Sequence, residues 1–313
     1  MAGQLVFGRG AVTKVLYIAG AGRSGSTLLA SVLGQGEGIV DVGELWKHWR
    51  KLADGGQQPC GCGQALGDCP FWIAVQRARP GVFDATPELL SAARRIGHAR
   101  GSLRLRAELA LGRSGTDTFA NAYEEAYAAI AQAAGARVII DSSKMPGPGF
   151  LVERMKSVEV YLLHFTRDPR AVAASWLVRK EGSDGAQALE TRKPAAVAKA
   201  WTARALATEL LLRPGVPRAH YRRIAYEDFA AKPQLVVSQI LEWVGEPSSG
   251  SAFTGERRVN LEVTHSSGGN PGRLSHGEQE ILPDERWKSS LLKEDRRKVE
   301  RLTFPLRRIY DYR

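Results

Sequence analysis

Residues 15–30, VLYIAGAGRSGSTLLA, have the composition of a strand, a phosphate-binding turn and a helix. An apolar run leads into closely spaced glycines, and the free N–H groups at the start of the following helix can bind an anion. The loop that binds nucleoside triphosphates has lysine directly before its last Ser or Thr, whereas Ser26 stands there in this chain. The nearest cation is Arg23. The segment therefore predicts a site for a phosphate-like group other than the triphosphate of ATP.

Besides this loop, three further segments carry characteristic polar and basic residues, and all four occur together in one enzyme family. Residues 22–28, GRSGSTL, resemble the 5′-phosphosulfate loop of sulfotransferases that use 3′-phosphoadenosine 5′-phosphosulfate (PAPS). Residues 162–175, LLHFTRDPRAVAAS, resemble the strand and helix with which the same enzymes bind the donor's 3′-phosphate. Residues 226–229, YEDF, and 265–273, HSSGGNPGR, also fit this family. The segments follow the family order, and the chain most resembles bacterial-type members with a glutamate base.

This resemblance implies a set of donor-binding residues. The 5′-phosphosulfate would lie on the loop formed by Gly22, Arg23, Ser24, Gly25, Ser26, Thr27 and Leu28. Arg167 and Ser175 would hold the 3′-phosphate, and the planar fork of a guanidinium suits that task because it matches phosphate oxygens bidentately. Tyr226 would contact the donor. A late loop would close over the nucleotide and supply a second 3′-phosphate clamp; its residues are Gly269, Asn270 and Arg273.

The resemblance also implies catalytic roles. Sulfuryl transfer, like phosphoryl transfer, needs in-line positioning and stabilisation of charge on the leaving phosphate. Arg23 would lie beside the bridging oxygen and Lys144 near the leaving or transferring group. A base must also take the acceptor's proton. Glu44 is our first candidate, because family members with a glutamate base place it in a Gly-Glu segment at a similar distance after the loop. His48 and His98 remain alternative bases.

Three cysteines, Cys60, Cys62 and Cys69, suggest a comparison with zinc sites. A structural zinc ion takes four ligands, and here the fourth would have to be a remote histidine such as His48. Some bacterial-type sulfotransferases have a similar stretch without metal catalysis. We therefore expect no metal and interpret the cysteine segment as a structural cap over the acceptor site. An odd number of cysteines also argues against a disulfide scaffold.

Alternating strands and helices must position these residues. The pattern predicts strands over residues 14–19, 137–140, 158–165 and 221–226, and loops over residues 34–44 and 248–272. It predicts helices over residues 24–33 with Ser24 as N-cap, 87–112, 119–134, from Pro169, and over 195–212, 234–244 and 283–310. Such alternation indicates an α/β fold with a parallel sheet flanked by helices and a P-loop-like core. Ligands then bind beyond the carboxyl ends of the strands, where the phosphate loop, Lys144 and Arg167 should converge.

Length and composition favour a single domain over residues 1–313, with a helical cap and acceptor region inserted at about 45–135. Hydrophobic residues make up 43% of the chain and the formal net charge is +11. Such a charge attracts anions. We find no nucleic-acid-binding signature, no secretory leader pattern and no apolar run long enough to span a membrane. We expect a cytoplasmic enzyme whose partner is a small-molecule acceptor rather than nucleic acid.

Two other functions stay open at this point. A P-loop kinase for a nucleotide or another small molecule would use a similar strand, loop and helix, although Ser26 in the lysine position and the pair of Arg167 and Ser175 argue against it. A basic polyanion-binding protein without catalysis is supported by the net charge alone. The sulfotransferase prediction covers most of the chain, and we expect PAPS as donor and a hydroxyl of a metabolite, glycan or lipid-like molecule as acceptor.

Overall fold

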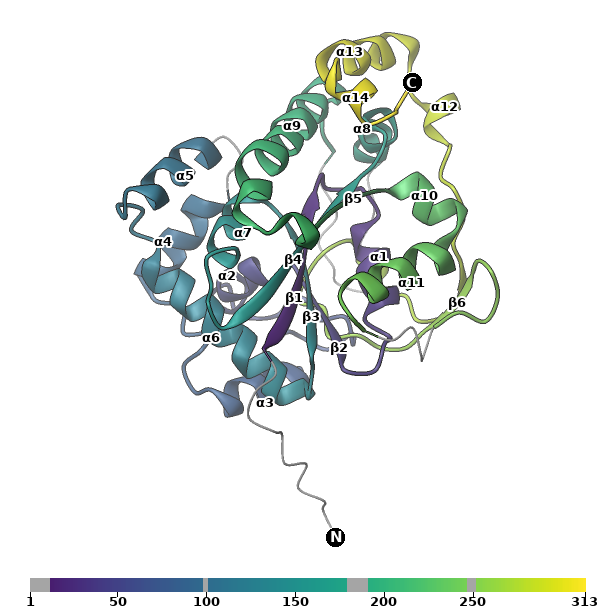
Figure 1. Ribbon diagram of the computed structural model, residues 1–313. Helices are drawn as coiled ribbons and strands as arrows, with labels where there is room; N and C mark the ends of the chain where they lie inside the picture. The colour runs from purple at the N-terminus through teal and green to yellow at the C-terminus, as the bar shows by residue number, and fades with distance from the viewer. Residues whose placement is uncertain (1–11, 98–100, 179–190, 247–251) are drawn as a thin grey trace.

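A twisted parallel sheet runs through the centre of the protein (Figure 1). The structure is a computed structural model that describes residues 12–97, 101–178, 191–246 and 252–313. Within these ranges the main sheet has five strands in the order β2-β3-β1-β4-β5, and every neighbouring pair is parallel. Their bounds are Ile39–Gly43, Val138–Lys144, Thr13–Gly20, Val158–Thr166 and Tyr221–Ala225, in that order. The predicted α/β fold with a flanked parallel sheet is confirmed.

The position of strand β1 between two cores explains why its sequence is almost continuously apolar. Val15, Tyr17 and Ala19 pack into the core on one face of the sheet, and Leu16 and Ile18 pack into the core on the other. Successive side chains of a strand point to opposite faces. Because helices cover both faces, neither set of side chains can be polar.

Helices α1 (Ser26–Leu33), α10 (Tyr226–Ala231) and α11 (Pro233–Trp243) contribute to the core on one face. The core on the opposite face is contributed by α7 (Pro146–Val152) and by the helices between β2 and β3, which we call the cap. Figure 1 shows these two groups on opposite sides of the sheet. The cap helices are α2 (His48–Ala53), α3 (Pro70–Ala78), α4 (Pro87–Ile96), α5 (Ser102–Ala110) and α6 (Asp117–Ala134).

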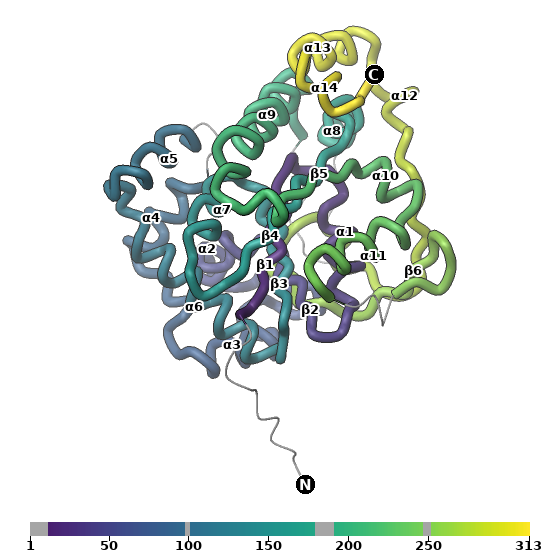
Figure 2. The backbone as a smooth tube through the Cα atoms, in the orientation of Figure 1, coloured from purple at the N-terminus to yellow at the C-terminus, as the bar shows by residue number. Residues whose placement is uncertain are grey.

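The C-terminal segment packs on helices that follow β4. Figure 2 shows the last helices beside α8 (Pro169–Leu177) and α9 (Pro194–Ala207). Helix α9 continues into a π-helix at Thr208–Leu212. Residues such as Val172, Trp201 and Tyr310 form a shared apolar cluster there. The last helices are α12 (Trp287–Ser290), α13 (Lys293–Thr303) and α14 (Leu306–Ile309), and a separate antiparallel pair is formed by β6 (Arg258–Leu261) and β7 (Gly277–Glu280).

Several predicted boundaries are wrong for identifiable reasons. Helix α1 begins at Ser26 with Gly25 as N-cap and no side-chain cap, so Ser24 is not the cap. Arg23 and Gly25 both have positive φ angles of 69° and 86°, which delay the start of the helix. Strand β2 lies in a segment predicted as a loop, since five residues that include an aspartate and a glycine carry little strand pattern. Strand β3 continues four residues beyond the predicted end at residue 140.

Helix α6 positions the end of β3. Tyr123 and Tyr127 lie one helical turn apart on its buried face, and both hydroxyls donate hydrogen bonds to the carboxylate of Asp141. The backbone N–H of Ser143 donates to the same carboxylate over 2.8 Å. Asp141 therefore orders the turn that leads to Lys144.

Candidate active site

A cavity of about 580 Å³ lies at the carboxyl ends of β1, β3 and β4. Segments that are far apart in the sequence meet in its wall. The predicted donor and catalytic residues that line it are Gly22, Arg23, Gly25, Ser26, Thr27, Leu28, Glu44, Lys144, Arg167, Ser175, Tyr226, Gly269 and Asn270. Ser24 and Arg273 are the predicted site residues within the described ranges that do not line it. The parallel sheet explains the convergence, because all of its strands end at this edge.

The phosphate loop has a backbone that requires glycine at position 25. Its φ angle of 86° is in the left-handed region, and a Cβ atom there would lie 2.6 Å from Cδ2 of the Tyr226 ring. Helix α1 starts directly after it, so its first N–H groups are available to an anion in the cavity. The aromatic ring of Tyr226 thus packs directly on the phosphate loop.

Arg23 has an unmatched charge beside this loop. Its guanidinium lies over the Trp176 ring at 5.0 Å from the centroid. Both Nη atoms are buried and have no hydrogen-bond partner among the residues that the structure describes. Burial lowers the pKa of Arg23, which reflects the cost of removing this cation from water. A buried donor without a partner is costly, so the arrangement favours an anionic ligand in the cavity.

Glu44 lies between two lysines at the end of β2. Nζ of Lys144 donates to Oε1 of Glu44 over 2.9 Å, and Lys47 forms an ion pair with the other carboxylate oxygen. Burial favours a higher pKa for Glu44, but the charges and hydrogen bonds of Lys144 and Lys47 outweigh it and hold the pKa well below its usual range. The carboxylate is therefore ionised, and its basicity depends on how strongly the two lysines hold it.

The other proposed bases are placed differently. His48 is fully buried between the rings of Trp72 and Phe83, with centroid distances of 4.1 Å to each. Burial and the nearby charge of Lys51 lower its pKa well below the usual value. His48 does not line the cavity, so an acceptor there cannot reach it. His98 lies outside the described residues. Of the base candidates that the structure describes, Glu44 is the one at the cavity.

Arg167 forms hydrogen bonds with groups of the protein itself. Its guanidinium donates to Oδ2 of Asp284 over 2.9 Å and to the carbonyl oxygen of Arg23 over 3.0 Å. It also lies over the Tyr226 ring at 4.3 Å from the centroid. The neighbouring Asp168 pairs with Arg170 instead, at 2.7 Å. A phosphate bound at Arg167 would therefore have to share the guanidinium with Asp284.

The residues of the late loop lie in two different environments. Gly269 and Asn270 line the cavity, and the N–H of Asn270 donates to Oγ1 of Thr27 over 3.3 Å. Arg273 is buried elsewhere, with its Nη2 donating to the carbonyl oxygen of Pro59 over 2.8 Å. The structure thus does not bring Arg273 to the cavity as a second 3′-phosphate clamp, because its guanidinium holds the cap segment instead.

Sequence reasoning missed further cations in the cavity wall. In the described part of the chain, seven basic and two acidic side chains line the cavity, so its wall carries an excess of positive charge. The basic residues that no motif had marked are Lys47, Arg192, Arg204 and Arg286. They come from helices and loops without a recognisable pattern around them. The closest available indication was the arginine-rich composition of the whole chain.

The cysteines lie outside the cavity, and a histidine that is remote in the sequence lies beside them. His48, the example that we named from the sequence, is not part of this group. His265, from the segment before the late loop, places Nδ1 at 3.3 Å from Sγ of Cys69. The ligand atoms of Cys60, Cys62, Cys69 and His265 all lie within 4.8 Å of one another. A remote histidine thus does complete a set of four possible metal ligands, although we expected no metal at these cysteines.

Comparison with known proteins identifies the family. The model of the sulfotransferase family matches residues 16–249. A sulfotransferase domain from the curacin biosynthetic pathway is similar in structure, with a TM-score of 0.53 and 17% identity over 94% of this chain and 99% of that one. A sulfotransferase domain of the Synechococcus PCC 7002 olefin synthase has a TM-score of 0.53 and 19% identity over 95% and 97% of the two chains. No curated protein matches the sequence. Among the described residues no helix is both long and apolar enough to cross a membrane. The chain belongs to the sulfotransferase family.

Proposed function

We propose that this protein transfers a sulfuryl group from PAPS to a hydroxyl of a small-molecule acceptor, such as a metabolite, a glycan or a lipid-like compound. The observation that carries the proposal is the shared cavity, in which the phosphate loop, the Glu44–Lys144 pair and the Arg167 region face one another. The sulfotransferase family uses PAPS as its donor, and the positively charged wall suits a donor with several negative charges.

In this proposal the donor binds at two anion sites. The N–H groups at the start of α1 and the unpartnered guanidinium of Arg23 bind the 5′-phosphosulfate. Arg167, directly after β4, and Ser175, on α8, both line the cavity and bind the 3′-phosphate. Tyr226 supports both sites, since its ring contacts the phosphate loop and stacks under Arg167.

The acceptor hydroxyl attacks sulfur as the bond between sulfur and the bridging oxygen of the 5′-phosphate breaks. The acceptor proton passes to Glu44, and adenosine 3′,5′-bisphosphate (PAP) leaves with the additional negative charge. Arg23 and Lys144, which both line the cavity, stabilise that charge. The reaction is balanced without a metal ion or a redox partner.

Donor binding would also activate the base. The charges and hydrogen bonds of Lys144 and Lys47 weaken the basicity of Glu44. The oxygens of a sulfuryl group compete with the carboxylate for Lys144. Because loss of a cationic partner raises the pKa of a carboxyl group, Glu44 becomes a stronger base when the donor is in place.

A labelled-donor assay tests this function. Purified protein incubated with PAPS carrying ³⁵S in the sulfuryl group and a panel of hydroxylated metabolites, glycans and lipids is expected to yield a labelled organic product. The rate is expected to be the same with and without millimolar magnesium, because the loop lacks the Walker lysine and the proposed charge stabilisation comes from Arg23 and Lys144. Transfer from γ-labelled ATP that depends on magnesium would instead identify a kinase.

A further inference from the structure

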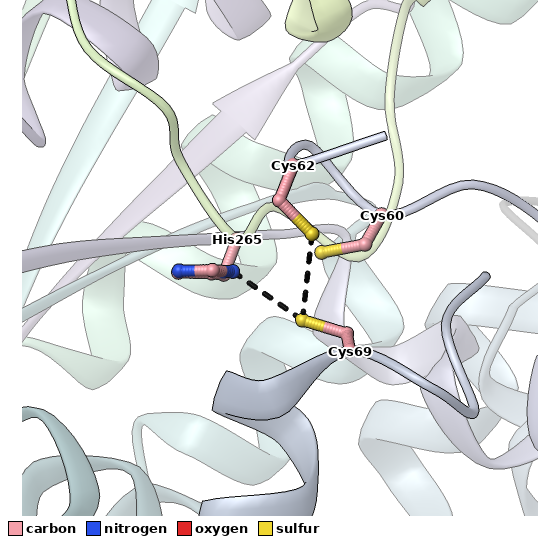
Figure 3. Close-up of side chains that lie close together, drawn as sticks. All are labelled: Cys60, Cys62, Cys69 and His265. Atoms are coloured by element: carbon pink, nitrogen blue, oxygen red, sulfur yellow. Dashed lines mark hydrogen bonds between the residues drawn. The ribbon is translucent and has the colours of Figure 1, made fainter. Parts of the chain in front are cut away.

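Three cysteines and one histidine form a compact cluster outside the proposed donor cavity (Figure 3). We call the set of Cys60, Cys62, Cys69 and His265 the Cys3His cluster. Cys60 and Cys69 are fully buried. The cysteines belong to the cap, whereas His265 comes from a segment about 200 residues farther along the chain, after β6. Figure 3 shows all four side chains pointing toward one another.

The spacing of the ligand atoms fits a tetrahedral metal ion. Sγ of Cys62 lies 3.7 Å from Sγ of Cys69, and Nδ1 of His265 lies 3.3 Å from the latter atom. Zinc bonds of about 2.3 Å to sulfur and about 2.0 Å to nitrogen give tetrahedral edges of roughly 3.8 Å between sulfurs and roughly 3.5 Å between sulfur and nitrogen. A disulfide would bring two sulfurs to about 2.05 Å, and all three cysteines of the chain are free.

Backbone contacts keep the two segments of the cluster together. The N–H of Gly61 donates to the carbonyl oxygen of Ser266 over 3.0 Å. A Cβ atom at Gly61 would lie 2.6 Å from the carbonyl oxygen of Thr264, so a larger residue could not sit between the first two cysteines. This glycine therefore permits the close approach that brings His265 to the thiols.

Aromatic residues after Cys69 hold the histidine in place. The indole N–H of Trp72 donates to the carbonyl oxygen of His265 over 3.0 Å. The Phe71 ring stacks on the imidazole with a centroid distance of 5.0 Å and an interplanar angle of 15°. The Cys-Pro-Phe-Trp sequence thus supplies one ligand and two residues that orient another. The cluster therefore has the donor atoms and the spacing of a preformed metal site, with the histidine ligand held by neighbouring residues.

We propose that a structural zinc ion binds to the Cys3His cluster. Three thiolates and one imidazole form a ligand set typical of structural zinc sites, in which four protein ligands leave no coordination position for a substrate. None of the four residues lines the proposed donor cavity. The site therefore differs from the catalytic one, and the inference stands independently of the proposed function.

The zinc ion would position the late loop over the donor cavity. Two residues after His265, Ser267 donates its N–H and its hydroxyl to the carbonyl oxygen of Val42 in β2, each over 3.0 Å. Gly269 and Asn270 then line the cavity. On the opposite side, Arg273 donates to the carbonyl oxygen just before Cys60. The segment that borders the cavity is thus held to the cap at both ends, by the metal ion at His265 and by the hydrogen bond of Arg273.

Metal analysis of the full-length protein tests the site. Protein purified under reducing conditions without chelators is expected to contain about one zinc ion per chain by inductively coupled plasma mass spectrometry. The variants Cys69→Ser and His265→Ala are expected to retain less than about a tenth of that amount, since each removes one of four ligands. His276→Ala is the matched control, because His276 is an exposed histidine near the cluster in sequence but outside it. It is expected to retain the full amount.

Cobalt titration keeps the test valid if a variant fails to fold. Metal-free, reduced wild-type protein is expected to take up about one Co²⁺ and develop the strong visible absorption of tetrahedral cobalt thiolates, which a slight excess of zinc removes. Zinc-loaded protein is expected to melt roughly 5 °C or more above the metal-free protein. Zinc content below about a tenth of an ion per chain together with no cobalt absorption would overturn the inference. A disulfide between two of the cysteines, or iron in place of zinc, would overturn it as well.

Discussion

Replacing Glu44 with glutamine is expected to lower kcat by about 10²- to 10⁴-fold, the usual contribution of a general base, while PAP binds nearly normally. Glutamine keeps the shape of the side chain, and its single amide oxygen can still accept a hydrogen bond from one of the two lysines, but it cannot take the acceptor proton. Steady-state kinetics with PAPS and calorimetric titration with PAP measure the two effects separately.

The matched control for this variant is Glu37→Gln, which makes the same change at an exposed position just before β2. It is expected to retain wild-type turnover. Near-normal turnover in Glu44→Gln would contradict the assignment. It would direct attention to His98, the remaining base candidate of the sequence analysis, since His48 is enclosed by aromatic rings.

Replacing Lys144 with methionine is expected to reduce kcat by about 10²- to 10³-fold, the typical effect of removing one donor to a developing oxyanion. The substitution keeps the length of the side chain and removes the charge. It also removes one of the two lysines that hold the pKa of Glu44 below its usual range, so that pKa rises. The acidic limb of the kcat/KM profile therefore moves to higher pH, because Glu44 must be ionised to act as a base.

A pH profile separates this role from a structural one. Loss of turnover in Lys144→Met with an unchanged acidic limb would show that the lysine does not act on Glu44. The surface variant Lys199→Met provides the control, because Lys199 is exposed on α9 and does not line the cavity. Its turnover and its pH profile are expected to match those of the wild-type protein.

The sequence predicted the sheet and the convergence of the main motifs because these depend on local patterns. Apolar runs such as those in β1 and β4 identify buried strands, and residues directly after parallel strands meet at one edge. Short elements without such a pattern, such as β2, were not predicted. The start of α1 was misplaced because a serine before an apolar run looks like an N-cap, whereas the phosphate loop needs Gly25 in a left-handed conformation.

Contacts between remote segments could not be predicted from local patterns. The pair of Arg167 and Asp284 joins residues 117 positions apart, and the contact of Cys69 with His265 joins residues 196 positions apart. Each partner alone has ordinary surroundings in the sequence. Arg273 illustrates the converse, since its motif suggested a phosphate clamp but packing directs its guanidinium to the carbonyl oxygen of Pro59.

Calorimetric titration of the purified protein with PAP, 5′-AMP and ATP tests the central claim most directly. A donor site with separate pockets for the 5′- and 3′-phosphates predicts that PAP binds about 30- to 150-fold more tightly than 5′-AMP, since the 3′-phosphate adds charge-assisted bidentate bonds worth about 2–3 kcal/mol. ATP is expected to bind more weakly than PAP with or without magnesium. Equal affinities for PAP and 5′-AMP, or tighter binding of magnesium-ATP, would contradict the account.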